Sequence, residues 1–220
     1  MTLLPEEWQR FERLAAGFGA RDSVVPAGVV TVQQVHGAGV VSCDDLPAGA
    51  HPEIKADALV VTRPGVVVGV KTADCVPILL MSPHTPGDTG CWAAAVHAGW
   101  RGSAAGVIAA AVENAARCGH APGKLCAAIG PSIGPCCYEV GQDVADTFRR
   151  LGLPVVERPH KPHLDLAEIA GALLMRAGLV AANVSRSAPC TRCHPERYHS
   201  YRANGPGAGR QVSWVGWLAP

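Results

Sequence analysis

Two histidines and one cysteine, His36, Cys75 and His97, have the residue types of a zinc-binding site. Each lies where a β-prone run ends or breaks, so folding can bring them together although they are far apart in the sequence. Three protein ligands with an open fourth position are typical of catalytic rather than structural zinc. The same residues support a second hypothesis, in which Cys75 is a nucleophilic thiolate and His97 is its base.

His97 closes the apolar run 91–96 and is followed by a small-residue turn and a helix-compatible segment, 103–117. A histidine at the carboxyl end of a buried strand lies where open α/β sheets bind ligands, although such a histidine is often only structural. The backbone amides that open the helix, with Arg101 beside them, suit an anion. We therefore predict that Arg101 binds phosphate.

Asp74 directly precedes Cys75 and has two interpretations. Its carboxylate could move a proton between the site and solvent. It could equally be a turn residue that caps backbone amides. The sequence does not choose between them.

The elements that must position these residues follow from hydrophobic periodicity. A strand–helix–strand order over 91–129 predicts a right-handed parallel crossover, and Asp165 with Glu168 predicts a capped helix start. The predicted helices are 5–16, 103–117, 142–151 and 166–177, and the predicted strands are 28–35, 57–62, 66–70, 76–81, 91–97, 124–129, 182–187 and 211–218.

Cys190, Cys193 and His194 have the C-x-x-C-H spacing of a c-type haem attachment site. That attachment requires export, and the N-terminal residues lack the apolar block of a signal peptide. A second zinc site would need another ligand pair, and none is obvious nearby in the sequence. We therefore predict that these cysteines are small buried residues of a loop.

The composition is that of a single globular domain of 220 residues, with 48% hydrophobic and 17% charged side chains. A net charge of +1 argues against nucleic acid as a partner, and no apolar run is long enough for a membrane helix. The absence of a signal peptide predicts a cytoplasmic protein. Its nine cysteines are then expected to be mostly reduced.

Several motifs together resemble the laccase-domain family, over about residues 28–218. In that family the two histidines and the cysteine of the first three motifs bind a catalytic zinc, which implies His36, Cys75 and His97 as ligands. Tyr201 and Arg202 are implied to line the substrate pocket. The motifs, in family order, are Gln-Val-His36-Gly, Thr-Ala-Asp-Cys75-Val-Pro, Ala-Val-His97-Ala-Gly-Trp-Arg-Gly, the Gly-Pro-Ser-Ile-Gly-Pro-Cys-Cys-Tyr-Glu-Val-Gly of residues 130–141, His163-Leu-Asp-Leu, Cys190-Thr and Ser200-Tyr-Arg202.

The resemblance implies a mixed α/β (α+β) fold, a single-domain β-sandwich flanked by helices and related to cysteine-hydrolase-like toxins. Family members have been called polyphenol oxidases, and bacterial ones are described as purine nucleoside phosphorylases with adenosine deaminase activity. A zinc enzyme acting on purine nucleosides and phosphate is thus implied, with methylthioadenosine as a further substrate. Members usually begin with a longer segment containing Ser-Thr-Arg-x-Gly-Gly, which is not found here, so a shortened N-terminal segment is expected in the domain 1–220.

Three alternatives to a zinc enzyme of purine nucleosides remain. Copper-dependent oxidation of phenols needs paired histidine clusters, whereas the nine histidines here are scattered with no His-x-His. A hydrolase using Cys75 and His97 is incompatible with a metal that occupies both side chains. A metal-holding protein without turnover is the third alternative.

Overall fold

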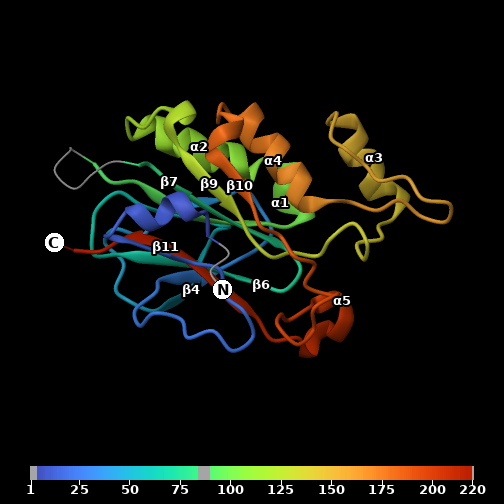
Figure 1. Cartoon of the computed structure of the whole chain (residues 1–220), viewed down its shortest axis with the longest axis horizontal. Coiled ribbons are helices and arrows are strands. Elements are labelled where there is room, and N and C mark those ends of the chain that lie inside the picture. Colours follow the sequence, from blue (N-terminus) through green and yellow to red (C-terminus); the bar gives the residue numbers. More distant parts are fainter. Residues whose placement is uncertain (1–3, 84–89, 220) are drawn as a thin grey trace.

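The computed structural model describes residues 4–83 and 90–219, which form two facing β-sheets with helices over one of them, and a separate two-stranded sheet (Figure 1). The larger sheet has the order β10 (Val184–Arg186), β9 (Cys126–Ile129), β7 (Val76–Met81), β8 (Ala93–Ala98), β5 (Ala58–Val61) and β3 (Val40–Ser42). The smaller sheet has the order β1 (Leu14–Gly17), β11 (Gln211–Trp217) and β6 (Val67–Thr72), and β2 (Thr31–Gln33) pairs with β4 (Ala50–Lys55).

Helices α2 (Val107–Arg117) and α4 (Leu166–Arg176) pack on the outer face of the larger sheet. The remaining helices are α1 (Trp100–Ala105), α3 (Gln142–Arg150) and α5 (Tyr201–Asn204), with short 3-10 helices at Glu6–Arg10, Pro122–Lys124, Ala181–Asn183 and Gly205–Gly207. None of the helices in the described residues is long and apolar enough to cross a bilayer.

Strand β7 lies at the centre of the molecule and every one of its residues is buried. Successive side chains of a strand point to opposite faces. Ile78 and Leu80 accordingly pack under the helices, whereas Leu79 and Met81 pack against the smaller sheet. This double burial explains why the segment is a continuous apolar run rather than an alternating one.

The predicted mixed α/β class is confirmed, and so are most of the central strands. Strands β8 and β9 are both antiparallel to β7, so they run parallel to each other, as the predicted crossover requires. The carboxyl ends of β8 and β9 therefore lie at the same edge of the sheet. The Asp165 Oδ1 atom accepts the Glu168 N–H at 3.0 Å, which confirms the predicted helix cap.

Three predictions were wrong in detail. The helix predicted over 5–16 is a 3-10 helix, Glu6–Arg10, followed by β1, because the backbone of β1 pairs with β11, a partner distant in sequence. The helix predicted over 103–117 is divided at Gly106, whose φ of 91° ends α1 in the left-handed region. Strands β3 and β4 were missed, since β4 is largely exposed and polar and has no apolar alternation.

Candidate metal and substrate site

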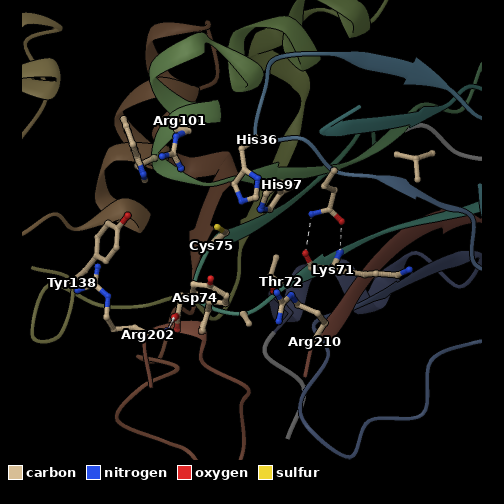
Figure 2. A pocket seen from close by; sticks show the side chains of 15 residues that line it. His36, Lys71, Thr72, Asp74, Cys75, His97, Arg101, Tyr138, Arg202 and Arg210 are labelled. Carbon is tan, nitrogen blue, oxygen red and sulfur yellow. Dashed lines mark hydrogen bonds between the residues drawn. The ribbon is translucent and has the colours of Figure 1, made fainter. Parts of the chain in front are cut away.

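The structure brings His36, Cys75 and His97 together (Figure 2). Their potential ligand atoms all lie within 4.8 Å of one another, and the two imidazole rings meet edge to face at 4.8 Å. His97 lies near the carboxyl end of β8, Cys75 lies in the turn from β6 to β7, and His36 follows β2. We call these three residues the His–Cys–His site.

His97 is buried and is held by a carboxylate that the sequence analysis did not single out, Asp57. The Nδ1 atom of His97 lies 2.8 Å from the Asp57 Oδ1 atom. Because an ionised carboxylate only accepts hydrogen bonds, Nδ1 carries the proton and Nε2 is left as the donor atom for a metal. Burial alone would raise the pKa of Asp57, but the hydrogen bonds from His97 and from the Gly37 amide lower it.

Asp57 also fixes the backbone around His36. Its two oxygens accept the N–H groups of His36 at 2.9 Å and Gly37 at 2.7 Å. His36 has a φ of 59°, a left-handed conformation that costs a non-glycine residue free energy, and these hydrogen bonds compensate for it. One carboxylate thus orients both histidines. The sequence contains a hint of this, since Asp57 is a carboxylate immediately before the apolar strand β5.

Cys75 has the electrostatic surroundings of a thiolate. Burial would raise its pKa, but hydrogen bonds with His36 and His97 outweigh burial and lower the pKa to about 6. Burial likewise opposes protonation of His97, yet Asp57 and Cys75 raise its pKa to about 9. The metal-free site therefore holds a Cys75 thiolate beside a His97 imidazolium. A metal cation can replace the proton on the Nε2 atom of that imidazolium.

The main chain approaches the site closely at Gly99. A Cβ atom at this position would lie 2.9 Å from the Cys75 sulfur and 3.3 Å from the His36 ring. Only glycine leaves the sulfur this space. Two imidazoles and one thiolate form a donor set that suits zinc with an open position and equally a copper ion, so the residues fit a metal without specifying which.

Asp74 lies beside Cys75 but turns its carboxylate toward the C-terminal part of the chain. Its Oδ1 accepts the Thr191 hydroxyl and its Oδ2 accepts the Arg202 backbone N–H, both at 2.6 Å. Its own carbonyl accepts the Ile133 N–H at 2.9 Å. With a φ of 89°, Asp74 forms a strained turn that joins three segments next to the sulfur. This geometry favours the capping interpretation of Asp74.

A cavity of about 620 Å³ opens over the His–Cys–His site. That volume is typical of a small-molecule site. Its wall includes the predicted residues Asp74, Arg101 and Arg202 (Figure 2). The predicted residue Tyr201 lines it as well. Several other lining residues were not predicted from the sequence, and they are Val32, Gln34, Lys71, Thr72, Ala73, Trp100, Tyr138 and Arg210.

The cavity wall combines aromatic rings with cations. The guanidinium of Arg101 lies 4.5 Å from the Trp100 ring centre, and that of Arg202 lies 5.0 Å from the Tyr138 ring centre. The Arg101 side chain is exposed and makes no hydrogen bond or ion pair with the described residues. It is therefore available to a ligand. Burial raises the pKa of Tyr138 to about 12, so its phenol keeps its proton and can donate.

Comparison with known proteins identifies a family. The sequence profile described as "Multi-copper polyphenol oxidoreductase laccase" matches residues 9–218. The chain is 41% identical to adenosine deaminase RL5 from an unknown prokaryotic organism, over 72% of this chain and 61% of that protein. It is 40% identical to a purine nucleoside phosphorylase of Deinococcus radiodurans, over 93% of this chain and 74% of that protein.

A solved structure has the same fold. The crystal structure of the hypothetical protein YfiH of Bacillus licheniformis superposes with a TM-score of 0.85 and 26% identity, covering 97% of this chain and 95% of that one. The two-sheet architecture with helices on one side is therefore the architecture of a known protein.

Proposed function

This chain belongs to the multi-copper polyphenol oxidoreductase laccase family, and we propose that it is a metal-dependent enzyme of purine nucleosides, with phosphorylase and adenosine deaminase activities. The observation that carries the proposal is the convergence of His36, Cys75 and His97 beneath a cavity of small-molecule size. The names of the two relatives, a phosphorylase and a deaminase, support the substrate class. The proposed setting is the cytoplasm, with methylthioadenosine as a further substrate.

We assign the His–Cys–His site to zinc, with copper as the alternative metal. Zinc with three protein ligands supplies Lewis acidity to a group bound in the cavity. Asp57 holds the ring of His97 and the backbone of His36 in the orientation that this requires. The carboxylate is wholly buried, so its hydrogen bonds do not compete with water.

The cations of the cavity wall favour phosphate. Lys71, Arg101 and Arg210 line the cavity, and Asp74 is the one carboxylate among the described lining residues. Both oxygens of Asp74 already accept hydrogen bonds, and the three cations outnumber this single carboxylate. Arg101 is the proposed phosphate ligand because its guanidinium, which lies over the Trp100 ring, makes no hydrogen bond or ion pair with the described residues.

The aromatic rings provide a surface for the purine. Trp100 and Tyr138 are each covered on one face by a guanidinium, which stiffens the wall. Tyr201 is 49% exposed and lies at the mouth, with Arg210 5.7 Å from its ring centre. A flat heterocycle stacks on such rings, and the protonated phenol of Tyr138 can donate to one of its nitrogens.

The two reactions would use the same cavity. In phosphorolysis an oxygen of hydrogen phosphate bonds to C1′ of the ribose while the C1′–N9 bond breaks, and the departing purine takes up the proton that the phosphate loses. In deamination water adds at C6 of adenosine and ammonia leaves, giving inosine. Arg101 contributes only to the first reaction in this proposal, because only the first reaction uses phosphate. Asp74 positions the turn at Cys75 and the start of α5.

A cysteine hydrolase is the second candidate function, and one observation favours it. Cys75, His97 and Asp57 are arranged as nucleophile, base and orienting carboxylate, with the pKa of Cys75 lowered to about 6. The proximity of His36 is not explained by that function, since a hydrolase of this type needs no second imidazole. A metal requirement separates the two candidates.

The deciding experiment uses protein purified without added copper. Metal content is measured first, and adenosine turnover is then followed with and without phosphate, before and after removal and return of zinc. We expect adenine and ribose 1-phosphate only with phosphate, inosine and ammonia without it, and neither product after zinc removal. Turnover that survives zinc removal but stops on alkylation of Cys75 would establish the hydrolase instead. Oxidation of a phenol only after copper loading would establish the oxidase.

A further inference from the structure

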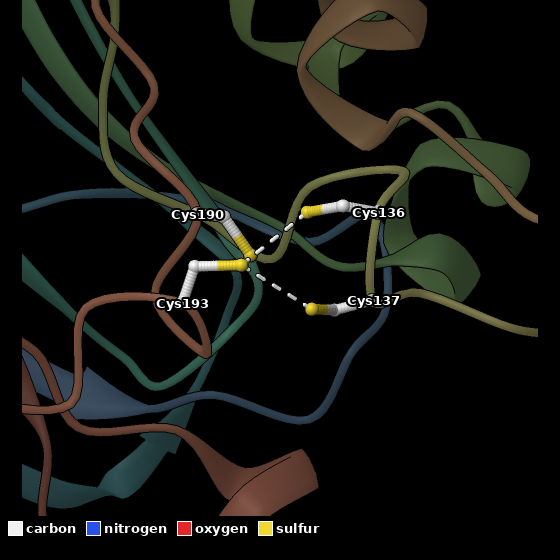
Figure 3. A group of neighbouring side chains, drawn as sticks. All are labelled: Cys136, Cys137, Cys190 and Cys193. Atoms are coloured by element: carbon white, nitrogen blue, oxygen red, sulfur yellow. Dashed lines mark hydrogen bonds between the residues drawn. The ribbon is translucent and has the colours of Figure 1, made fainter.

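A second group of potential metal ligands lies outside the His–Cys–His site, at the edge of the sheet where β9 and β10 end (Figure 3). It consists of four sulfur atoms from two segments that are distant in sequence, and all four lie within 4.8 Å of one another. We call it the four-cysteine cluster, and its members are Cys136, Cys137, Cys190 and Cys193. The sequence predicted buried loop cysteines here, whereas Cys193 is exposed and Cys190 is only half-buried.

The spacing of the sulfur atoms matches a tetrahedral metal site. The Cys193 sulfur lies 3.5 Å from the sulfurs of both Cys136 and Cys137. Zinc–sulfur bonds of about 2.3 Å place the sulfurs of a tetrahedron about 3.8 Å apart. The cysteines are unpaired thiols in the structure, so the cluster has the donors and the size of a closed Cys₄ site.

The backbone around the cluster supports anionic sulfur. The Gly134 N–H donates to the Cys190 sulfur at 3.2 Å. Burial would raise the pKa of Cys190, but the amides of Gly134 and Cys193 lower it. Amides aimed at a sulfur stabilise its thiolate and orient it for a metal.

The two segments that carry the cysteines are already joined by their main chains. Thr191 N–H donates to the Ser132 carbonyl at 3.0 Å, next to Cys190. Within the first segment, the amides of Cys137 and Tyr138 both donate to the Gly134 carbonyl at 3.0 Å, which forms a tight turn. This turn directs the adjacent side chains of Cys136 and Cys137 toward the same point (Figure 3).

We propose that the four-cysteine cluster binds one structural zinc ion, separate from the metal of the His–Cys–His site. Four thiolates leave no open coordination position, so the ion has no catalytic role. It fastens the loop after β9 to the loop after β10. The first loop carries Tyr138, and the second leads to Arg202, whose Nη1 donates to the Glu139 carbonyl at 2.9 Å. By holding these two loops together, the zinc therefore stabilises the part of the cavity wall that contains Tyr138 and Arg202.

The test uses the 220-residue protein in which Cys75→Ala has removed the thiolate of the other site. We expect this variant to keep one zinc ion, and X-ray absorption to show four sulfur ligands at about 2.3 Å and no nitrogen. Adding Cys193→Ser should abolish zinc retention and lower the midpoint of thermal unfolding. Adding Cys118→Ser, an exposed cysteine outside the cluster, should change neither.

Zinc absent from the Cys75→Ala protein, or bound through nitrogen or oxygen, would overturn the proposal. A disulfide between the two segments, found by mass spectrometry after alkylation of the anaerobically purified protein, would overturn it as well. The absorption measurement leaves all four cysteines intact, so the test does not depend on the folding of Cys193→Ser. It also does not depend on the proposed nucleoside activity.

Discussion

The His–Cys–His site and the four-cysteine cluster lie at the same edge of the larger sheet but differ in their donors and access. The first combines two imidazoles with one sulfur beneath a cavity of about 620 Å³. The second consists of four sulfurs, with no imidazole or carboxylate among its members. Three ligands under a cavity leave room for a reactant, whereas four ligands close the coordination sphere. The number of donor atoms and their access to a cavity, rather than the presence of cysteine, thus distinguish the proposed catalytic metal site from the proposed structural one.

The largest expected effect comes from Cys75→Ala. Loss of the only thiolate of the His–Cys–His site should lower the rates of phosphorolysis and deamination together by more than about 100-fold. Removing a residue that only hydrogen-bonds to a metal ligand costs less, about 10- to 100-fold. Thermal unfolding should change little, since the four-cysteine cluster keeps its zinc. Steady-state rates and differential scanning calorimetry check this pair of outcomes. Activity retained in Cys75→Ala would contradict the catalytic assignment of the site.

Asp57→Asn should have the next largest effect. The amide cannot accept hydrogen bonds from His97 and the backbone amides of His36 and Gly37 in the way that the carboxylate does. We expect zinc affinity and turnover to fall roughly 10- to 100-fold, with added zinc restoring part of the rate. The control is Asp45→Asn, a carboxylate that is 98% exposed. Equal zinc affinity in wild type and Asp57→Asn, by competition with a chromophoric chelator, would refute the orienting role.

A smaller and selective effect is expected from Arg101→Ala. A hydrogen bond to a charged group contributes about 1.5–3 kcal/mol, and the exposure of Arg101 favours the low end, so the KM for phosphate should rise about tenfold. Deamination should be nearly unchanged. Arg117→Ala, an exposed arginine at the end of α2, is the matched control. If both reactions fell equally, Arg101 would instead bind the nucleoside or support the fold.

The smallest expected effect is a difference in cysteine reactivity between the His–Cys–His site and the four-cysteine cluster after their metals are removed. With its pKa lowered to about 6, Cys75 should be alkylated at a rate that rises with pH up to about 6 and is level above it. At pH 7 it should react roughly three- to sixfold faster than a thiol of pKa 9.0, because its lower nucleophilicity offsets most of the gain in thiolate. Burial and the neighbouring sulfurs raise the pKa of Cys136, so its alkylation should still increase at alkaline pH. Mass spectrometry after short exposure to iodoacetamide resolves the two cysteines, and parallel profiles would show that the centres do not differ in this way.

Local sequence determined much of the fold. The apolar runs predicted β7, β8 and β9 within a few residues, because burial on both faces of a central strand leaves a continuous pattern. The Asp165 cap was also readable, since capping depends on residues only three positions apart. Residues 5–16 were misread because the pairing of β1 with β11 depends on residues about two hundred positions away. The hydrophobic periodicity of a short segment carries no information about a pairing partner so distant in the sequence.

The sequence also determined which residues form the His–Cys–His site, because each stands at the end of a recognisable run and matches a family motif. Only the tertiary structure decided that Asp57 orients two of them and that four cysteines meet. Strands β9 and β10 are adjacent and parallel, so the loops that follow them leave the same edge of the sheet and bring Cys136 and Cys137 to Cys190 and Cys193. Spacing along the chain does not record which strands become neighbours. The chemistry of each residue is thus local, whereas the choice of its partners depends on how the sheet is assembled.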